Sequence, residues 1–92
     1  MSQELRSLAE LLKERRQQLN LSLKEVENAT SIRVMHLEAI EEGRISEGVS
    51  SVYAQGFIKQ YGGFLGFDME QLAKEYPEAF QASLEKHEFA YG

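Results

Sequence analysis

A chain of 92 residues with 42% hydrophobic content buries a single core, and the lack of cysteine excludes disulfides and thiolate metal sites. Lys and Arg number 10 against 15 Asp and Glu, so the net charge is -5 and argues against a nucleic-acid binder, which normally carries a basic surface. The sequence has neither a run of about 18 apolar residues nor a basic-then-apolar leader, so we expect a cytoplasmic chain.

The first predicted helix spans about Glu4 to Gln18. Its leucines recur at the spacings of an amphipathic helix, with charged and amide side chains between them. These leucines are Leu5, Leu8, Leu12 and Leu19. A basic cluster in the same helix is interleaved with Glu10 and Glu14, which favours a solvated helix face over a phosphate site. The cluster consists of Lys13, Arg15 and Arg16.

A second, short helix is predicted from about Leu23 to Ala29, after Asn20, which suits the exit of the first helix. Ser22 can cap it, Glu25 lies three residues on, and Leu21 and Val26 occupy the two positions of a hydrophobic staple.

A third helix is predicted from Arg33 to Glu42, with Leu37 and Ile40 facing inward and Gly43 ending it. Only Ala29 to Ser31 link it to the second helix. Two short helices joined by so few residues cannot lie antiparallel, so the pair is typical of a helix-turn-helix.

The residues from Arg44 to Ser50 show no sustained period and are expected to form a loop. A fourth helix is predicted to begin at Ser50 or Ser51 and to end at Gly66, although its internal glycines weaken it. Its helical spacing is kept by Val52, Phe57, Tyr61 and Leu65, of which Val52 and Tyr61 are expected to face inward.

A fifth helix is predicted to open on the staple and capping pattern of Phe67, Asp68, Gln71 and Leu72 and to end before Pro77. Residues 78–87 are expected to add at most a turn or two of helix. The sequence therefore predicts a helix-turn-helix domain over residues 1–77 and a C-terminal extension or tail over residues 78–92.

A series of segments from the second predicted helix onward carries a family resemblance. The segments are LSLKEV (21–26), ATSIRV (29–34), LEAIEEG (37–43), VYAQGFI (52–58) and FLGFD (64–68). Their most specific feature is a tyrosine, an aromatic residue one helical turn later and a second tyrosine, which here are Tyr53, Phe57 and Tyr61. Over about residues 8–76 the chain resembles the N-terminal domain of the RodZ family.

The resemblance implies an all-α, compact five-helix domain, within a range of four to six helices, of the lambda-repressor-like helix-turn-helix type. It implies a cytoplasmic adaptor that binds MreB, the actin-like filament protein that guides rod-shaped wall synthesis. In the family a basic juxtamembrane stretch, a transmembrane helix and a periplasmic domain usually follow, so the membrane would be reached only through a segment absent from this chain. The pair Gly62-Gly63 departs from the more helix-favouring residues expected in the family.

Tyr53 and Phe57 are the first candidates for a protein contact, because residues four apart share a helix face. Periodicity alone favours core packing for this pair, whereas the resemblance implies that the pair contacts the filament protein. Tyr61 is expected in the core. Lys59 and Gln60 are expected to supply a polar rim or, equally, to form a solvated face.

The third predicted helix supplies the remaining candidates, Arg33, Met35 and His36. A flexible apolar side chain such as Met35 suits an adaptable protein contact, although it would equally cover a neighbouring loop. His36 is expected at the surface or the rim of the contact, because no second metal ligand lies near it.

The main alternative is a dimeric regulator of the Cro and lambda-repressor type that reads operator DNA through Arg33 to Ala39. Of the outward positions of that helix, only Arg33 and His36 are plausible donors to bases, and three glutamates would stand near phosphates. The outward positions are Arg33, Val34, Met35, His36, Glu38 and Ala39, and the glutamates are Glu38, Glu41 and Glu42. A third possibility is self-association through exposed aromatics, although we expect the isolated domain to be monomeric.

The sequence does not point to an enzyme. His36 and His87 lie far apart, neither has a serine partner that the sequence defines, and no glycine-rich loop follows a strand. We therefore assign no catalytic residue, no cofactor and no metal ligand.

Overall fold

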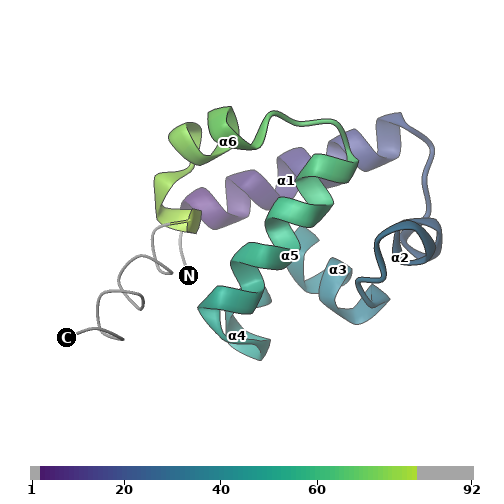
Figure 1. The fold of residues 1–92 in the computed structure, drawn as a ribbon, viewed down its shortest axis with the longest axis horizontal. Helices are drawn as coiled ribbons and strands as arrows, with labels where there is room; N and C mark the ends of the chain where they lie inside the picture. Colours follow the sequence, from purple (N-terminus) through teal and green to yellow (C-terminus); the bar gives the residue numbers. More distant parts are fainter. Residues whose placement is uncertain (1–2, 81–92) are drawn as a thin grey trace.

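The computed structural model describes residues 3–80. Over this range the chain forms helices and no strand, as expected for an all-α domain (Figure 1). The helices are α1 (Gln3–Gln18), α2 (Leu23–Thr30), α3 (Val34–Glu41), α4 (Ile45–Gly48), α5 (Ser51–Phe64) and α6 (Met69–Glu75). The predicted bounds of five of them agree with the structure within about two residues, which is the usual uncertainty of helix ends.

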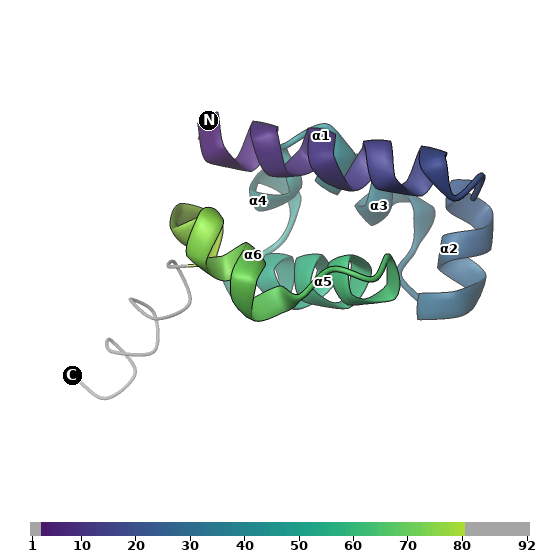
Figure 2. The same cartoon turned by 90° about the horizontal axis from the view of Figure 1, so that it is seen from above.

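Figure 2 shows α1 and α5 along opposite sides of the molecule, with α2 at one end and α6 beside α5. Between them α3 packs against α1, α2, α4 and α5. The core is formed by apolar side chains from all six helices and the segments between them. Its largest fully buried members are Tyr61, Leu8, Leu12, Leu37, Ile40, Ile45, Ile58, Leu65 and Val26.

Local hydrogen bonds hold the α2–α3 pair in place. Ser22 and Glu25 form the predicted capping box at the start of α2. Ser31 ends α2 in the left-handed conformation, with φ of 67°, and reverses the chain toward α3. The side chain of Arg33, the N-cap residue of α3, makes no capping hydrogen bond. The Glu27 carboxylate takes this role and accepts a hydrogen bond from the Val34 backbone N–H at 3.1 Å. The Glu27 carboxylate also accepts a hydrogen bond from Lys24. The hydrogen bonds from Lys24 and from the Val34 N–H together lower the pKa of Glu27.

The predicted loop from Arg44 to Ser50 is wrong in one respect, because it contains the short helix α4. A single turn shows no period in the sequence, but it places Ile45 in the core. Val52 is a second correction, since its side chain is exposed, whereas Ala54, Ile58 and Tyr61 are the buried face of α5.

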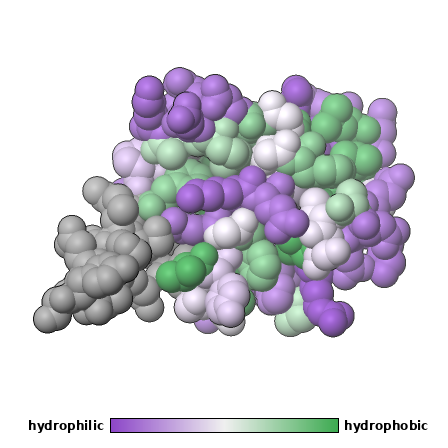
Figure 3. Space-filling model, viewed as in Figure 1, coloured by the Kyte–Doolittle hydropathy of each residue, from purple (hydrophilic) through white to green (hydrophobic). Residues whose placement is uncertain are grey.

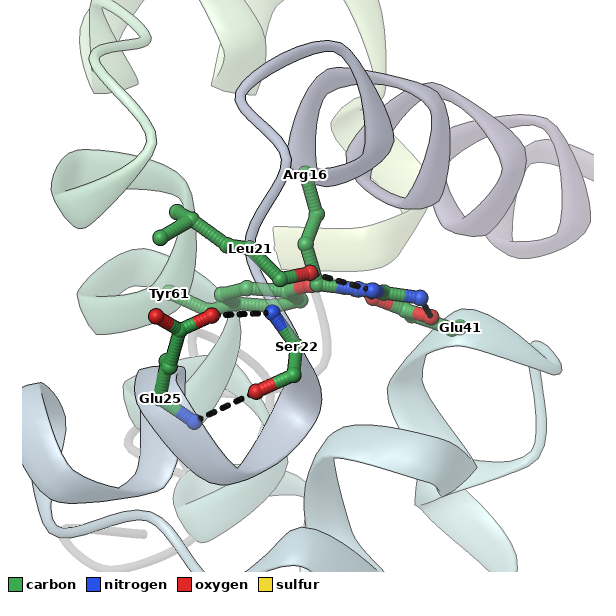
Figure 4. Close-up of polar contacts among 6 residues, drawn as sticks. All are labelled: Arg16, Leu21, Ser22, Glu25, Glu41 and Tyr61. Atoms are coloured by element: carbon green, nitrogen blue, oxygen red, sulfur yellow. Dashed lines mark hydrogen bonds and ion pairs between the residues drawn. The ribbon is translucent and has the colours of Figure 1, made fainter.

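The basic cluster of α1 is a third correction, because two of its members are tied into the fold. Arg16 pairs with Glu41 of α3 at 2.7 Å and donates to the Leu21 carbonyl at 2.7 Å, and the Tyr61 hydroxyl donates to the same Glu41 carboxylate (Figure 4). Arg15 donates to the Leu65 carbonyl at 3.2 Å. Lys13 is exposed as expected, and Leu19 lies beyond the end of α1 and is also exposed.

The α5–α6 connection depends on two glycines. Gly66 has φ of 96°, which disfavours any residue with a Cβ. Gly62 lies so close to α6 that a Cβ there would come within 2.8 Å of Met69 Sδ. The helix runs unbroken through Gly62 and Gly63 and ends at Phe64, and Asp68 caps α6 as predicted.

The end of the described chain packs on the domain. Residues 77–80 form a further helical turn, and Phe80 is buried in the core, three residues beyond the predicted domain boundary. The rest of the predicted extension, residues 81–92, lies outside the described residues.

Candidate protein-binding site

Three aromatic rings from α3 and α5 form a stack on the surface of the domain. The His36 ring lies on the Phe57 ring, with centroids 4.9 Å apart and planes inclined by 21°. Tyr53 lies on Phe57 with centroids 6.4 Å apart and planes inclined by 27°. We call His36, Phe57 and Tyr53 the ring stack.

The three rings of the ring stack differ in how much of their surface is exposed to solvent. Tyr53 has 66% of its surface exposed, whereas Phe57 and His36 are half-buried. Met35, the neighbour of His36, has 65% exposed. Phe57 packs against the core and contacts both other rings, and the two most exposed apolar side chains are Met35 on α3 and Tyr53 on α5. A contiguous group of exposed apolar and aromatic side chains is the kind of surface that marks an interaction site.

Gln60 and Lys59 occupy different sides of α5. Gln60, three residues after Phe57, donates from Nε2 to the Thr30 carbonyl at 2.7 Å and so ties α5 to the end of α2. Lys59 is exposed, but a residue two places after Phe57 points roughly 160° away from it around a helix. The structure therefore separates Lys59 from the ring stack, and it gives Gln60 a structural hydrogen bond at its edge.

The outward side of α3 differs in part from the one expected. Arg33, at the start of α3, and Glu38 are exposed, whereas Ala39 is buried and Val34 is half-buried. Met35, Glu38 and Glu42 are spaced by three and four, so they form one outward row. The Glu41 side chain points toward α1, where its carboxylate is paired with Arg16. This outward row of α3 thus carries one apolar and two acidic side chains, and the exposed basic residue Arg33 lies at the start of the helix.

A further apolar region lies at the other end of α5. Hydrophobic surface gathers at the upper right of Figure 3, where α5 ends and α1 passes into α2. Leu19 and Phe64 are exposed hydrophobic residues of these segments.

Within residues 3–80 no group of three His, Cys, Asp or Glu side chains is placed to hold a metal ion. None of the helices in that range is long and apolar enough to cross a membrane.

Sequence reasoning found Tyr53 and Phe57 as a pair on one face but missed that His36 extends them into a stack. The packing of α3 on α5 brings these rings together across 21 residues of chain, and nothing in helical periodicity reports such a pairing. The only signal in the sequence was that His36 carries a ring on the third predicted helix, which was expected to pack near the fourth.

The α2–α3 pair and its packing on α1 and α5 define a helix-turn-helix domain. Residues 11–72 match the family model of the helix-turn-helix domain, and the chain belongs to this family. Over 56 residues the chain is 38% identical to YmfM, an uncharacterized membrane protein of Bacillus subtilis (strain 168). The match covers 61% of this chain and 19% of that protein, so the chain spans about a fifth of its relative's length. No solved structure matches the chain.

Proposed function

We propose that the chain is the cytoplasmic adaptor domain of a RodZ-type cell-shape protein and that it docks on the actin-like filament protein MreB. The observation that carries the proposal is the ring stack, which presents aromatic side chains at the surface of a helix-turn-helix whose outward α3 row is acidic. The sequence resemblance implies this partner, and the similarity to part of a longer membrane protein fits a domain joined to a membrane anchor.

The proposed contact surface consists of Tyr53, Phe57, His36 and Met35, with Arg33 as an outer candidate. Gln60 lies at its edge, where it is bound to the Thr30 carbonyl, and Lys59 is left out because it lies on another side of α5. Tyrosine and phenylalanine bury a large area for few rotatable bonds, so they are common energetic centres of protein interfaces. Tyr53 is the anchor in this arrangement because it is the most exposed ring, and the Phe57 ring stacked against it packs on the core. Met35 adds an adaptable apolar surface at the side.

The test is binding of the purified domain to purified MreB from the same organism. We expect Tyr53→Ala to weaken binding by about 1 to 3 kcal/mol, the usual cost of losing an interface anchor, with little change in thermal stability. Val52→Ala is the matched control, because Val52 is the exposed neighbour of Tyr53 but points about 100° away around the helix. Equal loss of binding in both variants, or no binding by the folded wild type, would contradict the proposal.

A second candidate, operator binding as a dimer through α3, is favoured by the family itself and by the exposed Arg33 at the start of that helix. Its test is duplex DNA binding as a function of salt, because phosphate contacts release counter-ions and make affinity fall steeply with ionic strength. Given the acidic row of α3, we expect no such binding at physiological salt.

A further inference from the structure

His36 is the ring of the ring stack that comes from α3, and the packing of α3 on α5 holds its plane. Its imidazole lies over the Phe57 ring with centroids 4.9 Å apart and planes inclined by only 21°. In so flat a stack the aromatic contact uses one face of the imidazole, and the ring edge that carries Nδ1 and Nε2 points to the side. The contact with Phe57 therefore does not occupy either ring nitrogen.

The two ring nitrogens of His36 have no hydrogen-bond partner among the described groups of residues 3–80, where only its backbone is hydrogen-bonded. A neutral imidazole carries one N–H donor and one acceptor nitrogen, so in the isolated domain these groups are bound to water. Gln60, three residues after Phe57, differs because its amide already donates to the Thr30 carbonyl at 2.7 Å. His36 is thus a half-buried polar group within an apolar contact surface, and the fold itself does not satisfy its ring nitrogens.

A partner that covers the ring stack removes water from this edge of His36. A polar group that loses water without gaining a new hydrogen bond weakens the complex, so an entirely apolar pocket is a poor match for the imidazole. We propose that His36 determines which surface the ring stack accepts, and that the partner protein places an oxygen acceptor, a main-chain carbonyl or a carboxylate, against the imidazole N–H. This inference rests on the proposed function and adds the chemistry of the partner's docking pocket, which is apolar around Tyr53 and Met35 and polar at His36.

The test compares variants of His36 in binding of the purified domain to purified MreB at constant pH and salt. His36→Phe keeps a ring that stacks on Phe57 and removes both nitrogens. We expect it to bind roughly tenfold more weakly than the wild type, because the acceptor of the partner is left without a donor. Met35→Leu is the matched control at the neighbouring exposed position, whose side chain carries no N–H, and it should change the affinity by less than about twofold.

A second pair of variants separates the hydrogen bond from the ring. Glutamine and methionine side chains have similar length and lack a ring, but only glutamine carries an N–H donor. We therefore expect His36→Gln to bind several-fold more tightly than His36→Met. Circular dichroism melting shows whether each variant is folded, and if His36→Phe does not fold, the comparison of these two variants decides.

Each outcome bears on one proposal or the other. Unchanged or tighter binding by His36→Phe, or no advantage of His36→Gln over His36→Met, overturns the polar pocket, while loss of binding in Tyr53→Ala still supports the adaptor itself. No binding by the folded wild type overturns both proposals. Duplex DNA is titrated in parallel, because phosphate oxygens also accept hydrogen bonds. DNA binding by the wild type that His36→Phe abolishes would overturn the protein pocket and favour the operator-binding candidate.

Discussion

Arg16 shows how one residue joins three helices. Its guanidinium pairs with Glu41 of α3, whose carboxylate also accepts a hydrogen bond from Tyr61 of α5. Only 13% of the Arg16 side chain and 5% of the Glu41 side chain are exposed. Such a pair pays a desolvation cost when it forms, so its net contribution is modest, but removal of one partner leaves a buried charge without compensation.

We therefore expect Arg16→Met to lower the free energy of unfolding by about 3 kcal/mol. Lys13→Met on the exposed face of the same helix serves as the control and should change stability by less than about 0.5 kcal/mol. Urea denaturation at neutral pH measures both. Equal effects of the two substitutions would mean that Arg16 is as solvated as Lys13.

Tyr61 is expected to make the stability of the fold depend on pH in the alkaline range. Burial, and then the hydrogen bond to Glu41, raise the pKa of its hydroxyl well above its usual value of 10.0. A raised folded-state pKa means that the stabilisation is complete below the unfolded-state pKa and is lost as the pH rises above it, because only the unfolded chain then releases the proton. We expect stability to fall between about pH 8 and about pH 11 by more in the wild type than in Tyr61→Phe. Urea denaturation of both proteins at the two pH values measures this difference. An equal loss of stability in the wild type and in Tyr61→Phe would contradict the raised pKa of Tyr61.

At the scale of elements, α5 contains adjacent glycines with different roles. Gly62 faces α6 and lies under Met69, whereas a Cβ at Gly63 would meet nothing within 4 Å. A glycine inside a helix costs up to about 1 kcal/mol relative to alanine, so one of these residues is required by packing and the other is not.

We predict that Gly63→Ala raises the free energy of unfolding by about 0.5 to 1 kcal/mol, because it restricts the unfolded chain and meets no neighbour. Gly62→Ala should gain less or destabilise, because Met69 must move. Thermal melting of the two variants under the same conditions shows which of them is the more stable. A larger gain for Gly62→Ala would show that Met69 yields without cost.

At the scale of the whole molecule, exposed rings and a net charge of -5 have opposite effects on self-association. Exposed aromatics favour a two-fold contact between copies, whereas the net negative charge that every copy carries opposes it. We expect the repulsion to prevail and the isolated domain to sediment as a monomer at all accessible concentrations. A mass that rises with concentration, and returns to the monomer in Tyr53→Ala, would instead show that the ring stack binds a second copy.

Local signals in the sequence determined most of the helices. The leucine period of α1, the capping box at Ser22 and the cap at Asp68 depend on residues within one or two turns, so the sequence alone predicts them. The pair Tyr53 and Phe57 was likewise visible, because residues four apart on one helix are neighbours in any fold.

Only the tertiary structure decided which charged and aromatic residues meet across helices. Arg15 and Arg16 are structural because the C-terminal end of α5 and the helix α3 come within hydrogen-bonding distance of them. Ile45 is buried because α4 packs against α3, and His36 joins the ring stack because α3 packs against α5. These contacts join residues that are distant in the chain. The helical period of a sequence indicates which face of a helix is apolar, but it does not indicate which other helix covers that face.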